Sequence, residues 1–231
     1  MTLKLGDGMR RIRVIGAASG LGAQDHGCAD GPVAFHRSQA WHALQNHPQI
    51  DWGRTLFAHA MPGHGALERI AGLCRGLADE VAETLRTGAF PLVIGGDHSI
   101  AVGTWSGVAR QLGAPCGLLW MDAHLDAHTP ETSYSGALHG MPLACLFGQG
   151  DKRLLDLGLI GRQLDVAHTV VFGPRSWEPE EKALLERLGV KIFYMPEVQA
   201  RGLPAVLCEA MTIARTGTAG FGVSVDLDSI D

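Results

Sequence analysis

The chain has 231 residues, of which 46% are hydrophobic and 19% are charged, a composition that excludes wholesale disorder and allows one globular domain with a sizeable core. Its net charge of −5, without a basic block, argues against nucleic acid or an anionic membrane as the main partner. No apolar run approaches the roughly 20 residues of a membrane span, and the first residues lack a signal-peptide core, so we expect a cytoplasmic protein.

Predicted strands and helices alternate along the chain. The predicted strands are residues 11–16, 91–94, 117–121, 169–172, 191–194 and 220–225. The predicted helices are residues 33–44, 66–85, 100–112, 179–188 and 203–216, whereas residues 51–65 show no interpretable pattern. Because the strands are apolar without alternation, we predict an α/β fold in a single domain over residues 1–231, with a mostly parallel sheet covered by helices on both faces.

Possible metal ligands follow three of the predicted strands. They are His98, Asp122, His124, Asp126, Asp226 and Asp228. On an extended segment, residues i, i+2 and i+4 point to one side, so Asp122, His124 and Asp126 are expected to converge on one point, as are the two aspartates of the last segment. Open α/β sheets bind ligands just outside the carboxyl ends of their strands, so the three segments are expected to meet at one edge.

The number and chemistry of these ligands predict a metal-dependent hydrolase. Six ligands are too many for one catalytic zinc, which usually takes three from the protein. They suit two divalent ions that share bridging carboxylates. Carboxylates favour hard ions such as Mn²⁺ or Mg²⁺, and imidazole moves the choice towards Mn²⁺, Fe²⁺ or Co²⁺. Two ions roughly 3.5 Å apart can share one water molecule and lower its pKa, which supplies a nucleophile near neutral pH.

Four motifs taken together resemble the ureohydrolase (arginase/agmatinase) superfamily. They are Gly95-Gly-Asp-His-Ser99, Asp122-Ala-His-Leu-Asp126, Ser135-Gly-Ala-Leu-His-Gly-Met-Pro142 and Ser224-Val-Asp-Leu-Asp-Ser-Ile-Asp231. The third motif, with the preceding Thr129-Pro-Glu-Thr-Ser133, is most similar to the arginase branch. The resemblance implies the three-layer α/β/α arginase fold, two Mn²⁺ per chain, a small guanidino substrate, and assembly as a homotrimer or homohexamer.

The resemblance also implies a role for each ligand. The ligands of one manganese would be His98, Asp122, Asp126 and Asp226, and those of the other would be Asp122, His124, Asp226 and Asp228. Activated water would attack the guanidino carbon, and Asp126 would help to pass a proton to the departing amine. His139 matches the histidine that shuttles protons at the mouth of the pocket. The implied reaction is hydrolysis of L-arginine to L-ornithine and urea.

At the positions where the family contacts the tail of its substrate, this sequence matches the family's residues less closely. Ser133 and Ser135 match hydroxyls that hold the α-carboxylate, and Glu178 and Glu181 match acids that bind the α-ammonium, although Asp is usual at the first of these. His128 stands where an arginase has Asn. Lost or misaligned polar contacts of about 1–3 kcal/mol change substrate preference, so agmatine, guanidinobutyrate and formiminoglutamate stay open as substrates.

The sequence ends at Asp231, where family members continue for roughly another strand–helix–strand unit. That unit carries a Glu that pairs with the guanidinium, so the resemblance implies a family fold truncated at its C-terminus. Two alternatives of other classes follow. The chain could be a non-catalytic metal-binding paralogue, or a deacetylase of the same general fold with a single zinc ion.

Overall fold

The computed structural model describes residues 10–59, 62–113, 115–157 and 164–230. Its strands form two sheets, with strand order β2-β1-β3 in the first and β6-β5-β4-β7 in the second. The strands are β1 (Ile12–Ala18), β2 (Ile50–Phe57), β3 (Phe90–Gly95), β4 (Cys116–Met121), β5 (Thr169–Phe172), β6 (Lys191–Phe193) and β7 (Gly220–Val225). Every pairing between these strands is parallel, as the sequence predicted.

Helices and short 3₁₀ turns connect the strands. The α-helices are α1 (Gly31–His36), α2 (Gln39–Leu44), α3 (Ala66–Arg86), α4 (Ala101–Leu112), α5 (Pro142–Leu146), α6 (Lys152–Leu155), α7 (Pro179–Leu188), α8 (Met195–Arg201) and α9 (Leu203–Arg215). The 3₁₀ turns are η1 (His26–Asp30), η2 (His98–Ile100), η3 (Leu138–Gly140), η4 (Val166–His168) and η5 (Leu227–Ser229). Within the described ranges, no helix is long and apolar enough to cross a membrane.

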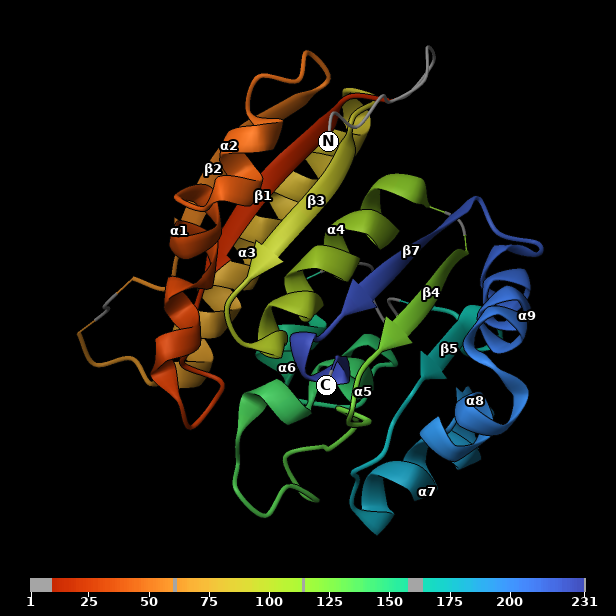
Figure 1. Ribbon diagram of the computed structural model, residues 1–231. Coiled ribbons are helices and arrows are strands. Elements are labelled where there is room, and N and C mark those ends of the chain that lie inside the picture. The colour runs from red at the N-terminus through yellow and green to blue at the C-terminus, as the bar shows by residue number, and fades with distance from the viewer. Residues whose placement is uncertain (1–9, 60–61, 114, 158–163, 231) are drawn as a thin grey trace.

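Helices cover both faces of the first sheet. Ile15 of β1 is buried in a core with Leu77 and Val81 of α3, whereas the next residue, Gly16, faces Pro32 of α1. Neighbouring residues of a strand point to opposite faces, so α1 and α3 lie on opposite sides of β1. Figure 1 shows the same arrangement, with α1 and α2 in front of this sheet and α3 behind it. The predicted three-layer α/β/α architecture is therefore confirmed.

The second sheet is packed in the same way around β4. Trp120 lies in the core with Trp105 of α4, and Leu119 lies in a separate core with Val206 of α9. Gly117 permits a very close approach of α9, because a Cβ at this position would lie 1.6 Å from a backbone oxygen of that helix. Strand β4, which leads directly into Asp122, is thus fixed by cores on both faces.

Strands β3 and β7 are end strands of their sheets and do not pair with each other within the described residues. Apolar side chains on these strands are exposed. They are Phe90 and Leu92 of β3 and Phe221, Val223 and Val225 of β7. These end strands therefore present apolar surface as well as unpaired backbone groups.

Several details differ from the sequence-based expectation, the first being that the strands form two sheets rather than one. Residues 51–65 contain most of β2, an end strand whose register with β1 shifts between Val14 and Gly16. The predicted helix 33–44 is two helices, because Ser38 accepts the backbone N–H of Trp41 and begins α2. Helix α8, directly after β6, was not expected from the sequence.

Candidate metal centre

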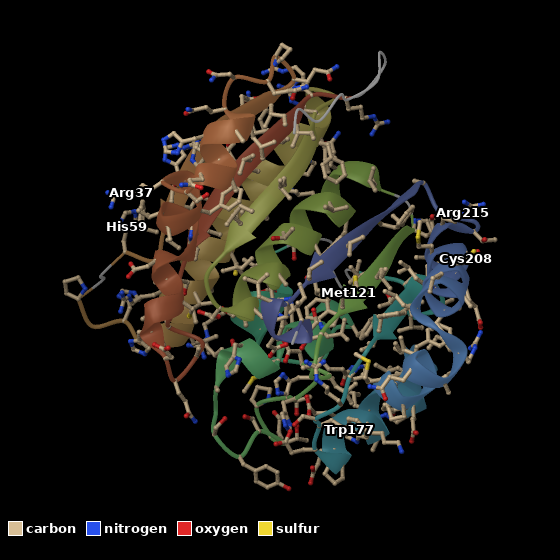
Figure 2. All side chains as sticks on the ribbon, viewed as in Figure 1. Arg37, His59, Met121, Trp177, Cys208 and Arg215 are labelled. Atoms are coloured by element: carbon tan, nitrogen blue, oxygen red, sulfur yellow. The ribbon has the colours of Figure 1, made fainter. Side chains whose placement is uncertain are left out.

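Strands β4 and β7 carry two of the candidate carboxylates to one edge of the sheet. The two strands pair in register, with Met121 opposite Val225, and Asp122 and Asp226 are the next residues along each strand. Asp226 stays joined to β4, because its backbone N–H donates to the carbonyl of Met121 at 2.9 Å. Met121 is labelled near the centre of the molecule in Figure 2. Both carboxylates therefore leave the sheet side by side.

His98 reaches the same edge from the other sheet. Beyond β3 the chain turns sharply, and Asp97 begins η2 by accepting the backbone N–H of Ser99 at 3.0 Å. The second oxygen of Asp97 accepts the backbone N–H of Gly22 at 3.1 Å and the hydroxyl of Ser19 at 3.2 Å. This buried aspartate thus binds the loop after β1 to the turn that presents His98.

Four candidate ligands form what we call the first ligand group. They are His98, Asp122, Asp126 and Asp226. The Nδ1 atom of the histidine lies 3.1 Å from Asp122 Oδ2, 2.9 Å from Asp126 Oδ2 and 3.2 Å from Asp226 Oδ2. Although these distances are short, Nδ1 is buried and has no hydrogen-bond partner of acceptable geometry among the described residues. A buried nitrogen that faces three carboxylates without a hydrogen bond is suited to a cation at their centre.

Two residues outside the predicted ligand set hold His98 in place. Its Nε2 atom lies 3.0 Å from the hydroxyl of Ser224 on β7. Its ring stacks on Trp120 of β4, with the ring centroids 4.2 Å apart. The indole N–H of Trp120 also donates to Asp122 at 3.0 Å. Partners of this kind orient metal ligands, and the alternation along each strand could have indicated both residues, because each lies two positions before an aspartate.

Asp122, His124 and Asp228 form the second ligand group. His124 Nδ1 lies 3.0 Å from Asp228 Oδ2 and 3.6 Å from Asp122 Oδ1. Asp122 is fully buried and belongs to both groups, with one oxygen towards each histidine. Asp226, which the sequence assigned to both ions, lies within only the first group. The two ligand groups together contain all six residues predicted from the sequence.

The backbone of these segments is not extended as the sequence pattern suggested. Asp122 Oδ1 accepts the backbone N–H of His124 at 2.8 Å, and Asp226 Oδ1 accepts that of Asp228 at 3.2 Å. Both segments are therefore turns closed by an aspartate side chain. Asp126 has φ of 49°, a left-handed conformation that Asp tolerates better than most residues. Side-chain turns and this reversal bring the ligands together, rather than strand alternation.

The carboxylates shift the pKa values of the groups around them. Burial opposes the charged form of His98, but the three facing carboxylates outweigh it and hold its pKa well above the ordinary value. Burial raises the pKa of Asp126 to about 7, and the charges of Asp122 and Asp226 add to the rise. The carboxylate of Asp122 raises the pKa of His124 to about 9. In the absence of a cation, the site therefore retains protons near neutral pH.

A third group, which we call the tail cluster, consists of His128, Glu178 and Glu181. His128 Nε2 lies 3.2 Å from Glu178 Oε2 and 3.6 Å from Glu181 Oε2. The two acids form the capping box at the start of α7, next to Trp177, which Figure 2 labels. The structure thus brings together, from two distant segments, three of the five residues that the sequence assigned to the substrate tail.

The remaining predicted residues lie in the loop between Thr129 and η3. Ser133 is half-buried and Ser135 is exposed, and their hydroxyl oxygens accept the backbone N–H groups of Gly136 and Ala137, respectively. His139 is half-buried in η3, and its backbone N–H donates to the carbonyl of Gly22 at 3.1 Å. These three residues belong to none of the three groups described above.

The comparisons with known proteins agree with this fold. The model of the arginase family matches residues 10–231. The chain is 36% identical to the arginase of Bacillus caldovelox, covering 96% of this chain and 77% of that protein, and 34% identical to the arginase of Brevibacillus brevis, with 96% and 76% covered. The solved structure of the Bacillus caldovelox arginase gives a TM-score of 0.87 at 35% identity, over 95% of this chain and 76% of that one. The chain therefore belongs to the arginase family of metal-dependent hydrolases.

Proposed function

We propose that this protein is a manganese-dependent ureohydrolase that cleaves a guanidino C–N bond and releases urea, with L-arginine as the reference substrate and L-ornithine as its second product. The main support is the position of Asp122, whose two oxygens face the histidines of two separate ligand groups. A carboxylate shared between two ligand groups would hold two divalent ions close together, and such a pair can activate a water molecule. The arginases of similar sequence and structure support the reaction.

The chemistry of the donors supports manganese. The two ligand groups supply carboxylates and imidazoles without a thiolate, which favours Mn²⁺ over softer ions. The buried Nδ1 of His98, faced by three carboxylate oxygens, fits a divalent cation. We propose two Mn²⁺ per chain, with Co²⁺ or Fe²⁺ as possible replacements. When bound, the two ions lower the pKa of a shared water molecule and so make it nucleophilic near neutral pH.

The side chains would then transfer protons and orient the substrate. The hydroxyl of the activated water adds to the guanidino carbon, and Asp126, which is 5% exposed, passes the released proton to the alkyl nitrogen. The bond between carbon and this nitrogen then breaks, giving urea and a free amine. His139, half-buried on η3, exchanges protons between the site and solvent. The tail cluster and the serines of the following loop hold the other end of the substrate.

Metal analysis combined with a substrate panel tests the proposal. We expect two Mn per chain, and urea release from at least one of L-arginine, agmatine and 4-guanidinobutyrate, with N-formiminoglutamate as the panel member that instead yields formamide. One Zn per chain with release of acetate from acetylated amines would instead identify a deacetylase. Absence of bound metal and of turnover on every compound would identify a non-catalytic paralogue and overturn the proposal.

Asp122→Asn gives a sharper test because Asn keeps the size and the turn-forming oxygen of Asp122 but removes the shared charge. We expect this variant to lose both metal ions and urea release. Asp79→Asn is the matched control, since Asp79 is exposed and pairs with Arg110 on the surface. Wild-type turnover by Asp122→Asn would contradict the mechanism.

Assembly as a homotrimer or homohexamer is a further part of the proposal, supported by the family resemblance. Light scattering coupled to size-exclusion chromatography measures the mass of the assembly directly. A mass equal to that of one chain at micromolar concentration would overturn this part.

A further inference from the structure

Glu181 in the tail cluster is already occupied by the protein's own backbone. The whole residue is 3% exposed. Its Oε1 accepts the N–H of Ala127 at 3.0 Å, and its Oε2 accepts the N–H of Glu178 at 2.9 Å. Both oxygens thus fix the start of α7 against the segment that carries the metal ligands. Glu178 also accepts a backbone N–H in the capping box, but 52% of its side chain is exposed against 4% for Glu181, so Glu178 is the acid that a positive group of a ligand can reach.

The imidazole of His128 already contacts Glu178. The side chain is buried, and its Nε2 lies 3.2 Å from Glu178 Oε2. A carboxylate only accepts hydrogen bonds, so Nε2 must carry the proton and donate it. Nδ1 lies 3.1 Å from the hydroxyl of Thr132, which can donate to it. The imidazole N–H is held where the N–H of a substrate ammonium would otherwise donate to Glu178.

The loop beyond His128 keeps its donors for a negative group. The hydroxyl oxygens of Ser133 and Ser135 accept backbone N–H groups at 3.0 and 3.2 Å. Each hydroxyl therefore retains its own proton for donation to a ligand. Hydroxyl donors of this kind suit a carboxylate. The tail end of the site thus offers donors for an anion, while its acids are already paired.

We propose that the site selects an ω-guanidino carboxylate that lacks an α-ammonium group, and that His128 determines this selection. The inference rests on the proposed ureohydrolase function, because it concerns how the same site recognises the tail of its substrate. An ammonium brought into the tail cluster competes with the imidazole N–H of His128 for Glu178 Oε2, and this competition weakens its binding. A substrate without this ammonium leaves the pair intact.

The matched probes are L-arginine and 5-guanidinopentanoate, which differ only by the α-ammonium. We expect the manganese-loaded wild type to hydrolyse 5-guanidinopentanoate with kcat/KM at least about tenfold above that for L-arginine, since the loss of one buried charged contact amounts to a factor of this size. His128→Asn should lower this ratio at least about tenfold. His128→Gln, whose amide N–H can still reach Glu178, should retain part of the preference.

His64→Asn is the control, because His64 is exposed in a surface loop, where its Nδ1 lies 3.1 Å from the carbonyl oxygen of Pro62. This variant should keep the wild-type ratio. A wild type that prefers L-arginine, or a ratio unchanged by His128→Asn in a variant whose thermal unfolding is that of the wild type, would overturn the inference.

Calorimetric titration separates failure of the inference from failure of the proposed function. L-ornithine and 5-aminopentanoate again differ only by the α-ammonium, and their binding to the manganese-loaded wild type needs no turnover. We expect 5-aminopentanoate to bind at least about tenfold more tightly. Absence of urea from every guanidino compound would overturn the proposed function, whereas tighter binding of L-ornithine would overturn the inference alone. This comparison also decides the matter if His128→Asn does not fold.

Discussion

Trp120 is expected to control metal affinity although it is not a ligand. It is fully buried, its indole N–H donates to Asp122 at 3.0 Å, and its ring stacks on His98 at a centroid distance of 4.2 Å. Trp120→Phe keeps an aromatic ring but removes the N–H. The shared carboxylate then loses the partner that fixes its orientation. We predict weaker Mn²⁺ binding with an otherwise intact fold.

The size of the expected loss in Mn²⁺ affinity follows from the contact that Trp120→Phe removes. A hydrogen bond to a charged acceptor contributes about 1.5–3 kcal/mol, and loss of a partner of this kind usually costs 10–100-fold in metal affinity. The smaller ring also leaves space in the core, which we expect to lower the free energy of unfolding by about 1–2 kcal/mol. Trp105→Phe is the matched control, because Trp105 lies in the same core but packs against Gly222. Trp105→Phe should lower the free energy of unfolding by a similar amount without changing the hydrogen bond between Trp120 and Asp122.

Isothermal titration of Mn²⁺ into both variants measures the difference, and thermal unfolding of the metal-free proteins shows whether each is folded. We expect Trp120→Phe to bind at least about tenfold more weakly than Trp105→Phe. Equal affinities within about twofold, in variants of equal thermal stability, would show that the indole N–H does not position the shared carboxylate.

Four further outcomes are expected. The pKa of Asp126 is raised from 3.8 to about 7 and that of His124 from 6.5 to about 9, so Mn²⁺ must displace protons when it binds. The apparent affinity for Mn²⁺ should therefore rise from pH 6 to pH 9. Titration calorimetry in buffers of different ionisation enthalpy measures the protons released. The same raised pKa values mean that protonation of Asp126 and His124 favours the folded state of the metal-free protein. This contribution to the free energy of unfolding is fully present below the unfolded pKa values and is lost as pH rises through about 7 and 9, and thermal unfolding across this range measures the loss. Ser224→Ala should weaken Mn²⁺ binding about tenfold by freeing the ring of His98, as measured by titration. Gly117→Ala should destabilise the fold by more than about 3 kcal/mol in urea unfolding, because the added Cβ would lie 1.6 Å from a backbone oxygen of α9.

The core of the fold could be predicted from the sequence because its central strands are short apolar runs bounded by turns. Strand β5 has the predicted bounds, and all of its residues are buried. Strand β2 could not be predicted in the same way, since it lies at the end of a sheet, is half-exposed and contains Gly53 with an irregular register. The division between α1 and α2 depends on one side chain, Ser38, whose capping oxygen is a weak signal within a continuous helical pattern.

The identity of the six metal-ligand candidates was predictable, but the geometry that gathers them was not. Alternation along an extended segment would place residues i, i+2 and i+4 on one side, whereas Asp122 and Asp226 each close a turn through their own side chains. Aspartate serves both as ligand and as turn-former, so one spacing fits both interpretations. The two orienting residues, Trp120 and Ser224, each lie two positions before a predicted ligand, but their contacts with His98 join segments far apart in the sequence, so the local pattern alone does not reveal what they orient.

The left-handed backbone at Asp126 explains how one short segment takes part in two sites. Its side chain faces His98 in the first ligand group, while the next N–H, from Ala127, donates to Glu181, and His128 faces Glu178. The metal ligands and the tail cluster are thus joined by two residues of backbone held at both ends. A backbone change that alters the tail cluster would also move a ligand. A substitution at His128 changes only the side chain and leaves that backbone in place. Position 128 is therefore where specificity for the substrate tail can change without moving the metal ligands.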